Sequence, residues 1–246
     1  MKHIRWQIVL GLALILLSAL LYYCHYLLFR DAHHIFIYMV GDIAFVPIEV
    51  LLVTLIIHKV LSIREKKNRL EKLNMVIGAF FSELGTTLLA RLSDADPQLE
   101  DIKKDLVITT KCSDREFAGF RKKLKTYAYD INSGKIDLES LRALLLGKRE
   151  FLLRLLENPT LLEHESFTDL LRAVFHAVEE LGSRGDIKQL PGKDIEHLAG
   201  DVKRAYSRLV FEWVDYMKHL KDNYPYLFSL AMRMNPFDQD PSPVVR

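Results

Sequence analysis

Two carboxylic acids and a proline interrupt an otherwise apolar stretch, residues 35–57, and these are the first side chains that could do chemistry. Asp42 and Glu49 are seven residues apart, so on a helix they lie nearly on one line, with Pro47 between them. An ionised carboxylate inside a bilayer is costly, and such residues usually face protein or water. The stretch is long enough to cross a hydrocarbon core of about 30 Å. Pro47 is expected to kink the helix there.

A second apolar stretch, residues 6–29, precedes the first and offers partners for the two acids. A loop of only five residues, 30–34, separates the stretches, so the spans must be antiparallel neighbours. Residue numbers at equal depth then add up to about 64 in regular helices. Tyr22 is expected to lie level with Asp42 and to donate a hydrogen bond to it, whereas Ser18 is the nearest polar group to Glu49.

Three interpretations of the intramembrane acids stay open. As neutral groups they hold helices together through hydrogen bonds. As ionised groups in an oligomer they line a cation or proton pathway. In the third interpretation they serve ligand or lipid sensing.

Histidines and basic residues provide weaker candidates. His25, His33 and His34 gather at the outer end of the hairpin and could hold a metal or haem. The pairs Asp194/His197 and His176/Glu179 match the inward-facing Glu-x-x-His pattern of di-iron bundles only in part, and solvent-exposed side chains explain them better. Residues 121–125 form a basic patch that could touch phosphates or simply be a solvated helix face.

No catalytic motif accompanies these groups. The sequence lacks a Gly-rich phosphate loop, a nucleophile setting and a kinase signature, so neither an enzyme nor a cofactor is predicted. The net charge of +2 is too small to indicate a nucleic-acid partner. Cys24 and Cys112 are the only cysteines, which leaves no disulfide framework.

The elements that position these side chains begin with a membrane hairpin, residues 1–58. Two basic residues precede the first span and a basic cluster follows the second: Lys59, Arg64, Lys66, Lys67, Arg69 and Lys72. Since basic loops stay inside, both termini are expected in the cytoplasm of a multi-pass protein, with only residues 30–34 outside. The lipid bilayer is therefore the first predicted partner.

A helical stalk, residues 59–92, should continue from the second span. Apolar residues recur there at coiled-coil spacing: Ile63, Leu70, Leu73, Ile77, Phe80 and Leu84. This seam predicts that copies of the chain associate into a homo-oligomer.

Residues 93–237 read as a cytoplasmic helical bundle, followed by a loose tail, 238–246. Ser113 and Glu116 form a capping box that opens one helix, expected to reach Ile131 and to close at Gly134. Further helices are expected over 138–156, from Ser166 to Gly182, over 194–223 and over 226–234. The fold class is therefore all-α: a two-helix transmembrane hairpin that continues through a stalk into a bundle.

Three stretches carry a resemblance to a known family: KLNMVIGAFFSELGT, ENPTLLEHESFTDLLRAVFHAVEEL and HLKDNYPYLFSLAMRMNPF. They resemble an uncharacterised prokaryotic family of two-span helical membrane proteins. The resemblance implies location in the cell membrane and no catalytic residue.

The leading functional hypothesis is a membrane-anchored oligomeric scaffold or regulatory protein that acts by self-assembly or by binding a partner, such as a cytoplasmic protein. The alternative is a small cation or proton channel or transporter subunit that uses Asp42 and Glu49. A membrane enzyme or redox protein is a third class with little support in the sequence.

Overall fold

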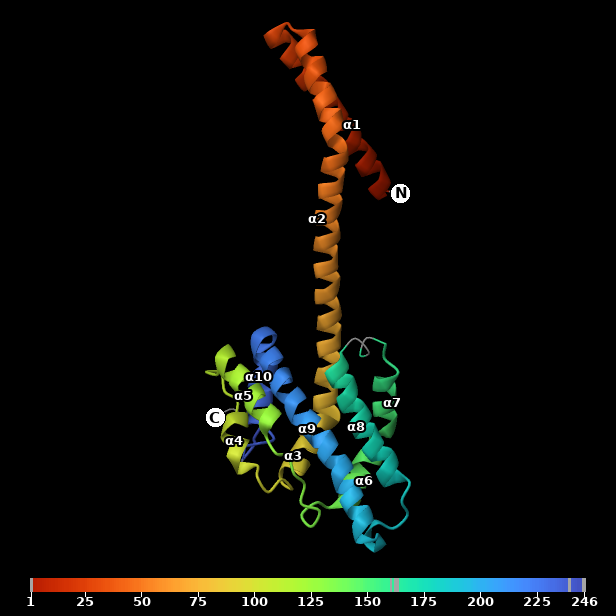
Figure 1. Ribbon diagram of the computed structural model, residues 1–246, viewed down its shortest axis with the longest axis vertical. Coiled ribbons are helices and arrows are strands. Elements are labelled where there is room, and N and C mark those ends of the chain that lie inside the picture. Colours follow the sequence, from red (N-terminus) through yellow and green to blue (C-terminus); the bar gives the residue numbers. More distant parts are fainter. Residues whose placement is uncertain (1, 160, 162–163, 239, 245–246) are drawn as a thin grey trace. The chain divides into compact units, whose positions relative to one another are not determined.

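A computed structural model describes residues 2–159, 161, 164–238 and 240–244 (Figure 1). Within these ranges every regular element is helical and no β-strand occurs, so the all-α prediction is confirmed. Packing divides the chain into two compact units between Lys66 and Lys67.

The first unit consists of α1 (Lys2–Phe29) and the first part of α2 (Ala32–Phe80), red to orange in Figure 1. Both helices are long and apolar enough to cross a membrane, with mean hydropathies of 2.2 and 2.3 over their most apolar windows. None of the residues in those windows is buried by the protein itself. Length and composition thus agree with the two predicted spans.

The connection between α1 and α2 is shorter than predicted. It contains two residues, Arg30 and Asp31, and not the five expected from the sequence. Arg30 adopts a left-handed conformation with φ 52°, which reverses the chain. The Asp31 carboxylate then accepts the backbone N–H groups of His33 at 2.9 Å and of His34 at 3.2 Å. Because a carboxylate in this position satisfies the free N–H groups of a helix start, α2 begins at once and includes both histidines.

The second unit contains the end of α2 and the remaining helices. Their bounds are η1 (Phe81–Gly85, a π-helical turn), α3 (Thr86–Ser93), α4 (Glu100–Leu106), α5 (Asp114–Thr126), α6 (Leu138–Gly147), α7 (Arg149–Leu156), α8 (Glu165–Gly182), η3 (Ile187–Gln189, a 3₁₀ turn), α9 (Gly192–Asn223) and α10 (Pro225–Arg233). α9 is the central element, and α8 packs along it while α10 covers its C-terminal end (Figure 1).

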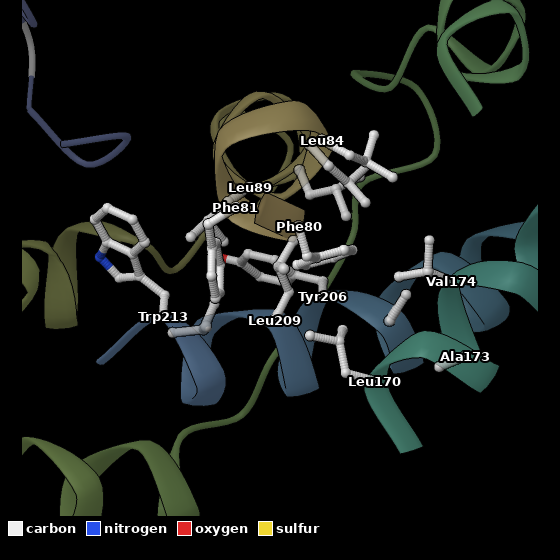
Figure 2. Close-up of a cluster of buried hydrophobic side chains, with 14 of the residues drawn as sticks. Phe80, Phe81, Leu84, Leu89, Leu170, Ala173, Val174, Tyr206, Leu209 and Trp213 are labelled. Carbon is white, nitrogen blue, oxygen red and sulfur yellow. The ribbon is translucent and has the colours of Figure 1, made fainter. Parts of the chain in front are cut away.

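The core of the second unit forms where the end of α2 and η1 meet α8 and α9. Phe80 and Phe81 are both fully buried and meet edge to face, with ring centroids 5.4 Å apart. Figure 2 shows Phe81 on the side of Trp213 and Phe80 on the opposite side, toward α8. Phe80 reaches the Phe167 ring of α8 at 5.4 Å. The hydrophobic effect of burying these aromatic rings is the main force that attaches α2 to the domain.

This core uses most of the seam that the sequence assigned to self-association. Four of its six residues are at most 4% exposed within a single chain: Leu73, Ile77, Phe80 and Leu84. Ile63 and Leu70 are 60% and 46% exposed. Only these two are free to meet a second copy. Residues 73–92, predicted as part of a stalk, belong to the compact second unit.

The helix starts follow the capping signals only in part. The helix predicted from Ser166 begins at Glu165, because the side chain of His164 caps it by accepting the backbone N–H group of Phe167. The Ser113–Glu116 capping box forms with both of its hydrogen bonds. The helix it opens ends at Thr126, not at Ile131. Tyr127 is extended, and its hydroxyl donates to Asp96 Oδ2 at 2.8 Å.

The predicted helix over 138–156 is divided at Lys148, whose φ of −110° departs from helical geometry. The tail, predicted as 238–246, lies partly outside the described residues.

Candidate functional site

An open groove lies on the surface of the second unit, where the end of α2, η1, α3, α9 and α10 meet. Its volume is about 680 Å³, inside the range of roughly 300–1,000 Å³ that is common for small-molecule sites. It is lined by Asn74, Met75, Gly78, Ala79, Phe81, Ser82, Thr86, Thr87, Trp213, Tyr216, His219, Leu220, Tyr224, Tyr226, Leu227, Leu230, Ala231 and Met234.

Stacked aromatic rings build one wall of the groove. Phe81 lies parallel to Tyr216, with ring centroids 4.7 Å apart and an angle of 13° between the planes. Trp213 meets Phe81 edge to face at 5.6 Å. Since Phe81 is held by the domain core, this wall is rigid and preformed.

The rim of the groove is apolar and open to solvent. Met75 of α2 is 63% exposed, and Tyr226 and Leu230 of α10 are 73% and 46% exposed. Exposed apolar surface that continues into a groove usually marks a binding site.

No charged side chain lines the groove, although 27% of the residues in the chain are charged. Its single titratable imidazole belongs to His219, and burial lowers the pKa of that side chain below 6.5, against the weaker opposing effect of Asp222. The groove is therefore uncharged at neutral pH. Trp213 Nε1 and His219 Nε2 are buried and have no hydrogen-bond partner among the described residues.

Glu212 lies beside Trp213 on α9 but on a different face of that helix. It lines a second pocket, of about 350 Å³, with Ser166, Asp169, Ser207, Arg208 and Phe211. The Glu212 side chain is 3% exposed. Burial raises its pKa above 4.5, and a hydrogen bond from Ser166 lowers it by less. The buried carboxyl therefore resists ionisation.

The Glu212→Gln variant should be more stable than the wild type at pH 7. A raised pKa in the folded state means that folding takes up a proton above pH 4.5, so stability falls as the pH rises. Removing the buried charge should raise the unfolding free energy by about 1 kcal/mol, or the midpoint of thermal unfolding by about 2–4 °C. The gain should shrink toward zero below pH 4.5, where the wild-type side chain is neutral in both states. Near-ultraviolet circular dichroism between pH 4 and 8 measures this.

Glu83→Gln is the control for Glu212→Gln. Glu83 lies on the surface, where a hydrogen bond from Lys148 lowers its pKa. Its replacement should not stabilise the protein at pH 7. A loss of stability in Glu212→Gln at pH 7 would contradict the effect assigned to burial.

The polar residues that were predicted to meet between the two membrane spans lie apart in the structure. Tyr22 and Ser18 line a pocket of about 440 Å³ together with Tyr38 of α2. Asp42 is not part of it. The reason is the two-residue connection, because helix ends at Phe29 and Ala32 make residue numbers at equal depth add up to about 61 and not 64. The predicted hydrogen bond from Tyr22 to Asp42 is absent.

Asp42 and Glu49 form no hydrogen bond or ion pair with any described residue, and both are exposed on α2. Pro47 lies between them inside the same helix. Both the helix-pairing and the ion-pathway interpretations therefore stay predictions.

The outer histidines come together only in part. The rings of His25 and His34 are stacked, with centroids 6.1 Å apart, and His34 also contacts Tyr38 at 4.7 Å. Within the described residues, His25, His33 and His34 do not bring three ligand atoms to one point.

The two partial di-iron patterns are not formed. Glu179 Oε1 lies 3.0 Å from Arg149 Nε, and Asp194 Oδ2 lies 2.7 Å from Arg184 Nε. Each carboxylate thus forms its ion pair with an arginine, and no ion pair with the histidine three positions away is formed.

The basic patch is partly neutralised by ion pairs. Arg121 pairs with Asp215 at 3.3 Å, and Lys123 pairs with Asp105 at 2.6 Å. Arg121 also lies over the Phe211 ring, 5.2 Å from its centroid. A solvated helix face explains these residues better than a phosphate site.

Sequence reasoning identified the helices around the groove but not the groove. The apolar residues of 226–234 were available as a signal, because a short helix after Pro225 with few polar positions has more apolar surface than one core contact can bury. The residues that line the groove come from segments about 140 residues apart along the chain. The spacing of apolar residues within one segment does not show that two such distant segments pack together.

Comparisons with known proteins identify relatives over nearly the whole chain. Residues 69–233 match the family model described as "Uncharacterized protein MJ1433, C-terminal helical domain", and residues 2–61 match "MJ1433, N-terminal helical domain". The "Uncharacterized protein MJ1433" of Methanocaldococcus jannaschii is 48% identical over 238 residues, which cover 97% of this chain and 96% of that protein. No solved structure matches. The two family models meet close to the division between the two compact units, and on this agreement of sequence and structure the chain belongs to the MJ1433 family.

Proposed function

We propose that this protein is a membrane-anchored regulatory protein whose helical domain binds an amphipathic, largely apolar small molecule. In this proposal α1 and the first part of α2 cross the bilayer, and the groove of the second unit is the binding site. The observation that carries it is the lining of the groove, which is mostly aromatic and apolar, with a few uncharged polar side chains and no charged one. Such a lining disfavours nucleotides, phosphates and acidic metabolites, whose charges would be left unpaired.

The proposal selects the binding branch of the earlier hypothesis over self-assembly. Most of the predicted seam already serves the core of one chain, while the groove remains open. Homo-oligomerisation stays a prediction that rests on Ile63, Leu70 and the unpaired acids of α2.

We further propose that the helical domain lies in the cytoplasm of a prokaryotic cell, with both termini on that side. The support is the basic cluster that follows the second span, residues 59–72, since such clusters stay on the cytoplasmic side. Labelling of a cysteine introduced at Ser183 by an impermeant thiol reagent outside intact cells would contradict this topology.

Trp213 provides a direct report on occupation of the groove. The chain has two tryptophans, Trp6 in α1 and Trp213 in the groove wall. In a Trp6→Phe background, Trp213 is the only tryptophan. We expect its fluorescence to change saturably when 1-octanol, a neutral amphipathic alkyl probe, is added to the full chain in nanodiscs.

Gly78 allows the groove to be blocked with a matched control. A Cβ at this position would lie 3.7 Å from Tyr216 Cε2, an ordinary contact, so Gly78→Ala should leave binding unchanged. Gly78→Leu places three more carbon atoms in the groove and should weaken binding at least tenfold. Equal affinity of the two variants, or no saturable change in Trp213 fluorescence, would contradict the proposal.

A further inference from the structure

Two histidine–carboxylate pairs face each other across the contact between α8 and α9. His176 and Glu180 lie on α8, and His197 and Asp201 lie on α9. The members of each pair are four residues apart, so their side chains lie on the same helix face one turn apart. The Glu-x-x-His pattern has a spacing of three residues, so it pairs these histidines with Glu179 and Asp194 and not with Glu180 and Asp201.

Ligand atoms of three of these side chains, His176, Glu180 and Asp201, lie within 4.8 Å of one another, and His197 lies against both carboxylates. His176 Nε2 and His197 Nε2 each lie 3.4 Å from Asp201 Oδ2. Glu180 offers Oε2 at 3.5 Å from His197 and Oε1 at 4.0 Å from His176. A tetrahedral ion with bonds of about 2.0–2.1 Å holds its ligand atoms about 3.3–3.4 Å apart. The distance from His176 to Asp201 matches that spacing and the distance from His176 to Glu180 is longer, while His197 is outside the three-residue group and contacts its two carboxylates.

Asp201 supplies a second and independent observation. It is 2% exposed, and its Oδ2 has no hydrogen-bond partner among the described residues. The distance of 3.4 Å to each imidazole is longer than an ordinary N–H···O hydrogen bond, about 2.7–3.2 Å. A buried carboxylate oxygen that is left unpaired is costly. A cation bound between Oδ2 and the two imidazoles would remove this cost.

Two arginines orient the carboxylates from outside the cluster. Arg204 forms an ion pair with Asp201 Oδ1 at 2.9 Å, and Arg184 donates a hydrogen bond to Glu180 Oε2 at 2.8 Å. Outer residues of this kind commonly fix the ligands of metal sites.

The types of ligand at the cluster decide which class of metal fits. Arg204 pairs with Asp201, and Arg184 is shared between Glu180 and Asp194, so the guanidinium groups offset only part of the negative charge of the carboxylates. Imidazole nitrogens favour transition-metal ions such as Zn²⁺ over hard cations such as Ca²⁺ or Mg²⁺. The histidine side chains are 45% and 56% exposed, which leaves the ion a path from solvent.

We propose that His176, Glu180 and Asp201 bind one Zn²⁺-like divalent metal ion that joins α8 to α9, and that the exposed side chain of His197, which contacts both carboxylates, turns in as the fourth ligand. The bound ion would tie together the two longest helices of the second unit, beside the core that supports the groove wall. The proposal is independent of the ligand assigned to the groove.

Isothermal titration calorimetry with Zn²⁺ as the only added ligand tests the site directly. The untagged full chain is purified in detergent and stripped of metal with a chelator before titration. We expect one equivalent per chain with a dissociation constant on the order of micromolar or tighter. Co²⁺ in place of Zn²⁺ should give the visible absorption of a tetrahedral ion with nitrogen and oxygen ligands.

Neighbouring glutamates on α8 provide a matched pair of variants. Glu180→Gln should weaken Zn²⁺ binding at least tenfold, whereas Glu179→Gln, whose parent carboxylate pairs with Arg149, should bind as the wild type does. His176→Gln and His197→Gln replace exposed side chains and should likewise lose binding while the metal-free proteins keep the wild-type thermal midpoint. Zn²⁺ should raise that midpoint only in chains that bind it.

Three results would overturn the proposal: the absence of saturable Zn²⁺ binding, equal affinities of Glu180→Gln and Glu179→Gln for Zn²⁺, or one full equivalent of Zn²⁺ bound to the double variant His176→Gln/His197→Gln. The last result would place the metal elsewhere, for example at the outer histidines of the hairpin.

Discussion

Replacing Phe80 with alanine should lower the free energy of unfolding of the helical domain by about 3–5 kcal/mol, the usual loss for a buried phenylalanine. Phe80 is fully buried, and its ring meets Phe81 and Phe167 edge to face, each at 5.4 Å. Removing the ring leaves a cavity at the junction of α2, α8 and α9 that these rigid neighbours cannot fill. The midpoint of thermal unfolding of the full chain, followed by near-ultraviolet circular dichroism, should fall by about 6–20 °C.

Leu70→Ala is the matched control, because Leu70 belongs to the same predicted seam but is 46% exposed. This change should alter the unfolding free energy by less than about 0.5 kcal/mol. If Leu70→Ala destabilises the protein as much as Phe80→Ala does, Leu70 must be buried between copies of the chain. A lower mass in light scattering of that variant would then show that the seam still holds an oligomer together.

Gly85→Ala should destabilise the domain by about 1–3 kcal/mol, as overpacking of a core does. A Cβ at this position would lie 2.7 Å from Phe81 Cδ1 and 2.8 Å from Phe80 Cε1. Both rings are fully buried and cannot turn aside. The π-helical turn from Phe81 to Gly85 brings the two rings against the backbone, so a residue without a side chain is needed there. The same thermal midpoint measures the loss.

Gly78→Ala makes the same chemical change seven residues earlier in the chain and should raise, not lower, the free energy of unfolding. Its new Cβ makes only an ordinary contact with Tyr216, and alanine favours the helix over glycine by about 1 kcal/mol. The difference in sign between the two variants is the decisive outcome. Equal effects at both positions would mean that the rings around Gly85 can rearrange.

The positions of helix starts were determined by local sequence. The Ser113–Glu116 capping box and the Asp137 cap form as their side chains require, and Pro225 begins α10 because proline is tolerated in a first helical turn. The two N-terminal helices follow from the length and apolarity of their sequences alone. These signals act over a few residues, so no knowledge of the tertiary structure is needed to interpret them.

Where a helix ends, and which of its faces is buried, was decided by the tertiary structure. Tyr127 continues the apolar pattern of α5, yet its backbone is extended and its hydroxyl donates a hydrogen bond to Asp96 in a distant segment. The heptad seam is equally ambiguous, because a stripe of leucines and phenylalanines packs as well against α8 and α9 of its own chain as against a second copy. Contacts with α8 and α9, which lie far away in the sequence, bury four of the six seam residues within one chain.

The candidate sites depend even more on tertiary structure. The groove joins the end of α2 to α9 and α10, and the proposed metal site joins α8 to α9. A sequence shows which residues share one helix face, and it therefore contained both histidine–carboxylate pairs. The angle and register at which two helices pack are set by all of the side chains between them, which is why only the folded domain brings Asp201 within 3.4 Å of His176.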